Sequence, residues 1–413
     1  MTIGVRHDDL RKRNRAMVIA AVRRSGQPSR TEIASATELS HSTISAISSD
    51  LINEGILAEA KSEATATKRG RPQVGLCLNP DAGVVLAIVL SLNSLSATMI
   101  DYSGTAIAQD ISRPATLSMG KAELIEVVLA AARRLIERPD LAEKRLLRIA
   151  LGIQGITDSD ARRLMWTPIT PEGDIDFADA LEEAFGIPVT VQNDCNMIAV
   201  ALRNRAPERY SDNFIAVLLS NGIGMGLVLR GELFTGSHSS GGEFGHMIHM
   251  PDGALCRCGR LGCIEAYAGN YAIFRHARGE GERAKPAADI DDATMLALAA
   301  AARDHEGRER DAFHKAGEAI GFGLGSLFAL IDPAPVAIVG LGASAFDIIE
   351  PSIREAIAKT AGGQHNAAIS FDLEPDEAPL IREGCARQAL TFVDQEIFAP
   401  GQAMQALAGR EVA

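Results

Sequence analysis

The chain has 413 residues, of which 46% are hydrophobic and 23% are charged, so it can form two or three domains with large cores. It has no run of eighteen apolar residues, and its charged N-terminus has no apolar signal core, which predicts a cytoplasmic protein without a membrane span. The net charge of −12 is unevenly distributed: residues 1–80 hold twelve Lys and Arg against eight Asp and Glu, whereas the rest holds 29 against 45. A basic segment joined to an acidic body is typical of proteins that contact nucleic acid through one domain.

The first 80 residues predict three helices. A helix is expected over residues 9–25, and Gly26 to Pro28 end it. Ser29-Arg30-Thr31-Glu32 has the pattern of a capping box and begins a short second helix. Ser40 is the expected N-cap of a third helix, which Gly55 ends. The third helix has one buried stripe, formed by Ile44, Ile47, Leu51 and Ile52.

The opposite face of the third helix carries small hydrogen-bonding side chains, as a helix in the major groove requires. These candidate DNA contacts are His41, Ser42, Thr43, Ser45 and Ser48. Strands are expected at 56–60 and 74–78, and the loop between them carries Arg69 and Arg71, which could reach phosphates or a narrow minor groove. The pattern predicts a winged helix-turn-helix domain over residues 1–80. The alternative is a three-helix packing module with a polar surface.

The body alternates strands and helices, which predicts an α/β fold. Strands are expected at 84–90, 96–101, 148–153, 189–192, 215–219, 226–229 and 335–339, and helices at 121–138, 177–185 and 312–331. The sheet-forming stretches at about 81–190 and 191–400 predict two lobes separated by a cleft within one domain, 81–413. Residues 277–292 are charged and rich in Gly and Ala, which favours a surface insertion.

Asn193 and Asp194 directly follow the strand at 189–192. A carboxylate at the C-terminal end of a strand is well placed to project into a cleft. The alternative is that Asp194 caps a helix over 195–201. The Gly-rich turn at 220–226 lies between two strands and is compatible with either a phosphate loop or a tight hairpin.

Four candidate metal ligands fall within eighteen residues of a chain that has only six Cys. They are His246, Cys256, Cys258 and Cys263. Three thiolates and one imidazole form a good tetrahedral ligand set for a structural Zn²⁺, and the spacing is too local for a disulfide framework. Glu243 and Glu265 flank the cluster, and a structural zinc does not require them. Ordinary buried thiols are the alternative reading.

Gly-Glu-Phe-Gly-His at 242–246 and Cys-Arg-Cys-Gly-Arg-Leu-Gly-Cys-Ile-Glu at 256–265 resemble the signature of the ROK family (repressors, open reading frames and kinases). The resemblance implies a two-lobed, actin-like and hexokinase-like fold with a zinc loop over 246–263. It also implies a sugar site, for which the matching residues are Asn193, Asp194, Glu243, His246 and Glu265. In ROK kinases the residue matching Asp194 is the general base. The opening of the third helix and the Arg-Gly-Arg-Pro at 69–72 resemble ROK transcription regulators.

The chain departs from ROK kinases at the first phosphate loop. ATP-using members have Asp-x-Gly-Gly-Thr after the first strand, whereas residues 87–96 here contain neither Asp nor Gly. Side chains such as Leu92 would occupy space that a phosphate needs. Leu341 also replaces the usual Gly of the adenosine-side loop. These changes predict loss of phosphoryl transfer, so the protein is expected not to be an enzyme.

Together these features predict a transcriptional regulator of carbohydrate genes. We interpret it as a repressor, and the alternative is an activator. The expected partners are double-stranded operator DNA and a sugar or sugar-derivative effector. The expected assembly is a homodimer, with a tetramer as the alternative. Two alternatives stay open: a sugar kinase carrying a DNA-binding head, and a regulator that responds to a protein partner.

Overall fold

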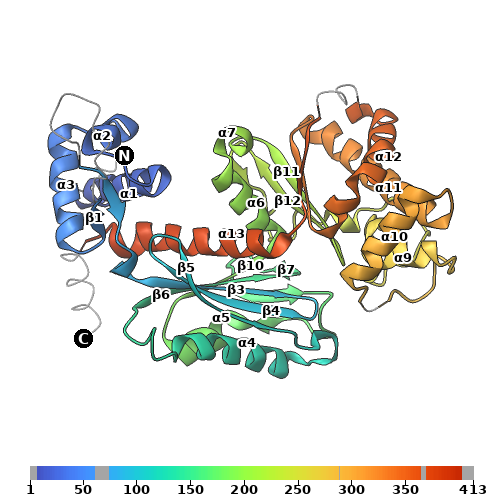
Figure 1. The fold of residues 1–413 in the computed structure, drawn as a ribbon, viewed down its shortest axis with the longest axis horizontal. Helices are drawn as coiled ribbons and strands as arrows, with labels where there is room; N and C mark the ends of the chain where they lie inside the picture. The colour runs from blue at the N-terminus through green and yellow to red at the C-terminus, as the bar shows by residue number, and fades with distance from the viewer. Residues whose placement is uncertain (1–6, 61–73, 288, 364–368, 402–413) are drawn as a thin grey trace.

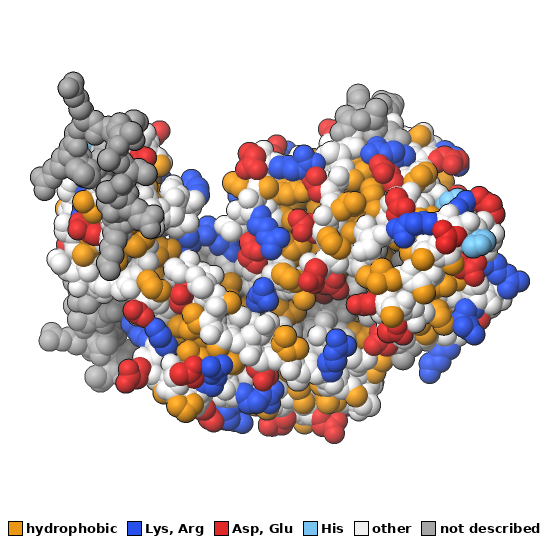
Figure 2. Space-filling model, in the orientation of Figure 1, with side chains coloured by type: hydrophobic (Ala, Val, Ile, Leu, Met, Phe, Trp, Pro, Cys, Tyr) orange, Lys and Arg blue, Asp and Glu red, His pale blue; other side chains and the backbone are white. Residues whose placement is uncertain are grey.

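The computed structural model describes residues 7–60, 74–287, 289–363 and 369–401 (Figure 1). The head lies at one end of the molecule, and a long C-terminal helix connects it to the body. The space-filling view shows a hollow between the head and the second lobe, and acidic and basic side chains are mixed over the visible face of the body (Figure 2). Within the described part of the chain, no helix is long and apolar enough to cross a membrane.

The head has the expected helices and strands. They are α1 (His7–Ser25), α2 (Arg30–Thr37), α3 (His41–Asn53), β1 (Leu57–Glu59) and β2 (Leu76–Leu78). The capping box is confirmed, because the Ser29 backbone N–H donates to Glu32 Oε2 at 2.7 Å and the Glu32 N–H donates to Ser29 Oγ at 3.3 Å. Ser40 caps α3, accepting the Thr43 N–H at 3.1 Å. β1 and β2 pair antiparallel.

The first lobe contains a five-stranded sheet in the order β10-β6-β3-β4-β5. Its strands are β3 (Val84–Ser91), β4 (Ser94–Asp101), β5 (Ala106–Ser112), β6 (Leu146–Ile153) and β10 (Val189–Asn193). β10, β6 and β3 are parallel, so their C-terminal ends meet at one edge, which faces the second lobe. α4 (Lys121–Ile136) and α5 (Phe177–Phe185) pack on one face of the sheet. A small sheet follows β6 and contains β7 (Ile156–Thr157), β8 (Arg163–Trp166) and β9 (Ile175–Asp176).

The second lobe has a five-stranded sheet in the order β13-β12-β11-β14-β15. Its strands are β11 (Phe214–Leu219), β12 (Ile223–Leu229), β13 (Glu232–Leu233), β14 (Val336–Val339) and β15 (Phe371–Glu374). The helices of this lobe pack into one core with β11, β12 and β14. They are α8 (Glu265–Ala268), α9 (Asn270–Ala277), α10 (Asp292–Asp304), α11 (Arg308–Ile331) and α12 (Phe346–Ala358).

The chain then leaves the second lobe. α13 (Glu377–Phe392) packs against α6 (Asp194–Arg205) and against β3 and β6 of the first lobe. It continues as a π-helical turn, η6 (Val393–Phe398), which contacts α1 of the head. The predicted second lobe, 191–400, includes α13 and η6, and these two elements also contact the first lobe and the head. A short helix α7 (Pro207–Tyr210) follows α6.

Candidate functional site

A cavity lies between the two lobes. The first lobe contributes the end of β10, the start of α6 and Trp166, and the second lobe contributes β12, the loop at 239–246 and the first residue of α8. All five residues predicted for the sugar site line this cavity: Asn193, Asp194, Glu243, His246 and Glu265. A concave site between two lobes with a few convergent polar groups is typical of small-molecule binding sites.

Asp194 is the first residue of α6 and is 4% exposed. Its Oδ1 accepts the Cys195 backbone N–H at 2.8 Å, and burial raises the pKa of its carboxyl to about 7. The alternative reading of Asp194 as a helix cap is wrong. Asn193 caps α6 instead, with Oδ1 accepting the Asn196 N–H at 3.0 Å and Nδ2 donating to the Gly155 carbonyl at 2.9 Å. Asp194 is therefore left to face the cavity.

Glu265 connects the cavity to the cysteine loop. It is 5% exposed, with Oε2 accepting the Ile223 N–H at 3.2 Å and Oε1 accepting the Tyr271 hydroxyl at 3.3 Å. Glu243 Oε2 lies 4.0 Å from His246 Nε2, and burial raises the pKa of Glu243. Trp166, from the first lobe, packs edge-on to the His246 ring with centroids 5.6 Å apart. The cavity therefore combines carboxylate acceptors with one aromatic wall.

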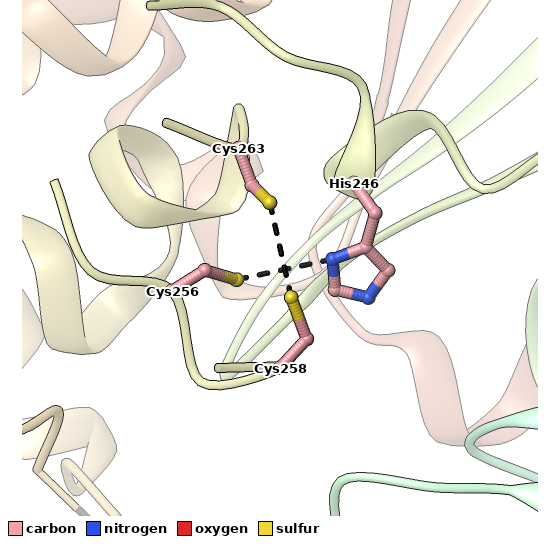
Figure 3. Close-up of side chains that lie close together, drawn as sticks. All are labelled: His246, Cys256, Cys258 and Cys263. Atoms are coloured by element: carbon pink, nitrogen blue, oxygen red, sulfur yellow. Dashed lines mark hydrogen bonds between the residues drawn. The ribbon is translucent and has the colours of Figure 1, made fainter. Parts of the chain in front are cut away.

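The four predicted metal ligands converge (Figure 3). Their ligand atoms all lie within 4.8 Å of one another. The Cys258 and Cys263 sulfurs are 3.8 Å apart, and Cys256 Sγ is 3.8 Å from His246 Nδ1. A tetrahedral ion with metal–sulfur bonds of about 2.3 Å requires sulfurs about 3.8 Å apart. The cluster could therefore hold a metal ion.

The cysteine loop also supports the pocket through Arg257, which the sequence did not single out. Its guanidinium donates to the Asn221 carbonyl at 3.1 Å and the Ala287 carbonyl at 3.2 Å, and it stacks over the Tyr271 ring. Residues 277–292, expected to be a surface insertion, thus pack partly on this loop, and the Leu255 N–H also donates to the Glu282 carbonyl at 2.9 Å. The sequence contains no local pattern that predicts these contacts of the cysteine loop, or the packing of Trp166 against His246.

The stretch that replaces the phosphate loop is a tight hairpin between β3 and β4. Leu92 is 8% exposed and packs in the core of the first lobe, and Asn93 takes a left-handed φ of 52°. Asn93 Nδ2 donates to Asp289 Oδ2 of the second lobe at 3.0 Å. This turn thus bridges the two lobes through side chains.

The candidate DNA-facing surface is on α3. His41, Ser42 and Ser45 are exposed, and Thr43 is half-buried with its hydroxyl bonded to Ser40 Oγ at 2.8 Å. The prediction for Ser48 is wrong, because this side chain is fully buried in the head. Ser48 lies four residues after Ile44 and three before Leu51, on the apolar stripe itself. Arg69 and Arg71 lie outside the described residues.

A buried polar network joins the head to the C-terminal segment. Arg23 of α1 donates to both carboxylate oxygens of Asp394, at 2.7 and 2.8 Å, and to the Tyr102 carbonyl at 3.0 Å. The Tyr102 hydroxyl donates to Asp394 Oδ1 at 2.8 Å, and burial together with this carboxylate raises the pKa of Tyr102. Arg15, 1% exposed, donates to the Phe398 carbonyl at 2.9 Å. Head and body are therefore fixed to each other.

Known proteins are similar to this chain over most of its length. The chain is 24% identical over 359 residues to a xylose repressor of Caldicellulosiruptor bescii, covering 85% of this chain and 88% of that protein. It is 23% identical over 353 residues to the DNA-binding transcriptional dual regulator NagC of Escherichia coli, covering 85% and 86%.

Solved structures share the fold. A ROK family transcriptional regulator, described as a homologue of the E. coli MLC protein, has a TM-score of 0.78 at 22% identity and covers 95% of this chain and 99% of its own. A ROK family glucokinase from Streptomyces griseus, solved with glucose and AMPPNP, has a TM-score of 0.59 at 22% identity and covers 74% and 100%. The two-lobed α/β fold is thus confirmed. A model of the ROK family matches residues 94–378, more than half of the chain, and the protein therefore belongs to the ROK family.

Proposed function

We propose that the protein is a sugar-responsive transcriptional regulator, acting as a repressor of carbohydrate uptake or metabolism genes. The head binds operator DNA through α3, and a sugar bound between the lobes controls that binding. The relatives named as repressors of sugar genes support this function. The observation that carries it is the continuous packing from the cavity, along α6 and α13, to the head.

The route from cavity to head consists of directly packed elements. α6 begins at Asp194 in the cavity, and α13 lies against it so closely that a Cβ on Gly384 would sit 2.0 Å from the Met197 carbonyl oxygen. α13 leads into η6, whose Asp394 binds Arg23 of the head. Since packed interfaces shift as units, a sugar that changes the lobe angle would move the head. Such a shift requires the sugar to bind the two arrangements with different affinity.

We also propose that the His246 cluster holds a structural Zn²⁺. Its sulfur spacing fits a tetrahedral zinc, and all four coordination positions are filled by the chain, as in structural sites. The zinc would fix the cysteine loop. This loop contacts the Gly-rich turn at 220–226 through Arg257 and Asn221, and it contacts the cavity wall through Cys256 and Glu265. It would take no chemical part in sugar binding.

Phosphoryl transfer is not part of the proposed function. The hairpin at Leu92 and Asn93 supplies neither the backbone amides nor the carboxylate that phosphate and metal need. The intact Asn193–Asp194 pair favours the second candidate, a sugar kinase with a DNA-binding head, because Asp194 is placed as a base. ATP turnover on a sugar panel, abolished by Asp194→Asn, would establish that candidate.

The operator-bound form is proposed to be a homodimer, or a tetramer built from dimers. Two-fold related heads would then occupy half-sites about 34–36 Å apart or a multiple of this distance. Double-stranded operator DNA and the sugar are the proposed partners, and a cytoplasmic location follows from such a role.

The test is capture of fragmented genomic DNA from the source organism by the purified full-length protein. Enrichment of palindromic sites beside carbohydrate genes, released by a sugar, is expected. Ser45→Glu places a carboxylate on the exposed face of α3 and should abolish capture, whereas Glu183→Gln, at an exposed position of α5, should not. Equal capture by Ser45→Glu would reject α3 as the DNA-reading element.

A further inference from the structure

We infer that the effector is a sugar without a negative charge, either a neutral sugar or an amino sugar, and that phosphorylated and acidic sugars are excluded. The inference rests on the proposed function, since it specifies the ligand of the same cavity. It is carried by the charges that line the cavity.

The cavity wall has carboxylates and no balancing cation. Among the nineteen described residues that line it there is no Lys or Arg, whereas three are acidic: Asp194, Glu243 and Glu265. Proteins that bind phosphate monoesters supply Arg, Lys or a helix N-terminus with free N–H groups to the anion. Here the N-terminus of α6 is occupied by Asp194 and Asn193, which accept its first N–H groups.

The geometry of the carboxylates suits hydroxyl donors. Glu265 Oε2 accepts the Ile223 N–H at 3.2 Å, and Glu265 is thereby held in place while it lines the cavity. Asp194 uses Oδ1 for the Cys195 N–H, and its carboxyl lines the cavity. Carboxylate oxygens only accept hydrogen bonds, so sugar hydroxyls or an ammonium group complement them, and a phosphate does not.

The nearby cation does not neutralise this wall. Arg257, which lies beside the Asn221 turn, is engaged by the Asn221 and Ala287 carbonyls and the Tyr271 ring. A zinc ion in the cysteine loop would be outweighed by its three thiolates, so the loaded centre would also carry a net negative charge.

A fourth carboxylate, that of Glu377, contacts the turn at Ser220 beside the cavity. Glu377, at the start of α13, accepts the Ser220 hydroxyl at 3.0 Å and lies beside Gly340. A sugar phosphate extending from the cavity toward this turn would meet a further negative charge.

Trp166 provides the readout, because it is the only tryptophan in the chain and it lines the cavity. Its emission is measured in the full-length protein at pH 8 and low salt with paired probes. The pairs are glucose and glucose 6-phosphate, N-acetylglucosamine and its 6-phosphate, and glucosamine; xylose and gluconate are added singly. Calorimetry on the same pairs gives a second, independent reading.

We expect at least one uncharged or amine-bearing probe to bind, and its anionic counterpart to bind about a hundredfold more weakly or not at all. Glu243→Gln removes one charge and should narrow that ratio, and the remote Glu183→Gln should leave it unchanged. Salt should weaken glucosamine binding and leave neutral-sugar binding nearly constant.

A failure of this inference can be distinguished from a failure of the proposed function. If a phosphorylated or acidic probe binds more tightly than its neutral partner and releases operator DNA, the inference is overturned and the proposed regulator stands. If no probe of either charge changes the emission, the binding heat or operator binding, both the inference and the sugar-responsive function are rejected.

Discussion

At the scale of single residues, Asp194 has a pKa that ties the stability of the fold to pH. Burial raises this pKa from 3.8 to about 7, so between these values the folded protein holds a proton that the unfolded chain releases. Stability from this residue is therefore fully present below about pH 4 and is lost as the pH rises through about 7. The raised pKa corresponds to about 4 kcal/mol at most.

Asp194→Asn should remove this dependence while preserving the shape of the side chain. Melting temperatures of both proteins are measured from pH 5 to pH 8. The wild type should lose more stability than the variant as the pH rises. Glu243 and Glu377, whose pKa values are also raised, are present in both proteins, and their charges add to the raised pKa of Asp194 in the wild type. Parallel curves for the two proteins would contradict the buried, perturbed carboxyl.

Cys258→Ser tests the metal centre at the same scale. Wild-type protein should contain about one zinc per chain, and the variant should lose most of it because only three ligands remain. The loop carrying Arg257 should loosen, which weakens effector binding and lowers the melting temperature. Cys77→Ser in β2, outside the cluster, is the matched control and should keep its zinc. Zinc-free wild-type protein with normal stability would refute the centre.

At the scale of elements, the contact between α1 and η6 should decide how firmly the head is held. Asp394→Asn keeps the shape but removes the charge that Arg23 and Tyr102 contact, and it leaves a buried guanidinium without its anion. We expect a loss of about 3 kcal/mol of stability and a head that moves independently of the body. Limited proteolysis between the head and body measures this, with Glu396→Gln at the exposed Lys12 pair as control. Equal cleavage of all three proteins would mean that the network does not anchor the head.

The elements predicted from sequence were those with local signals. The capping box at Ser29 and the apolar spacing of the helix at 177–185 define both segments without reference to the rest of the chain. α13 had no such signal, since it packs against two layers at once and its pattern is not one-sided. Its return to the first lobe depends on close approach at Gly384, which a sequence pattern does not encode.

In the candidate site, too, the residues with a local spacing pattern were predictable, and those that reach the site through tertiary packing were not. The four metal ligands lie within eighteen residues, so spacing alone predicted their convergence. Trp166 and Arg257 reach the site through tertiary packing, and no local pattern marks them. Ser48 differs from the prediction because a hydroxyl group suggests an exposed position, whereas the spacing of Ser48 from Ile44 places it on the buried stripe.

At the scale of the whole molecule, sugar binding and DNA binding should be coupled reciprocally. If a sugar weakens operator binding by some factor, operator DNA must weaken binding of that sugar by the same factor. A coupling of about 2 kcal/mol would appear as a factor of about 30 in each direction. Titrating Trp166 emission with sugar, with and without operator, gives one factor, and operator titrations with and without sugar give the other.

Gly384→Ala tests whether this coupling passes along α6 and α13. The added Cβ would lie 2.0 Å from the Met197 carbonyl oxygen, so the two helices must move apart, and both factors should fall toward one. Binding of sugar alone and of operator alone should persist, because the cavity residues and α3 are untouched. Gly281→Ala is the matched control, since an added Cβ there meets no atom within 4 Å. If Gly384→Ala folds and keeps the full reciprocal factor, the signal must reach the head by another route, and the contact between α6 and α13 is structural support only.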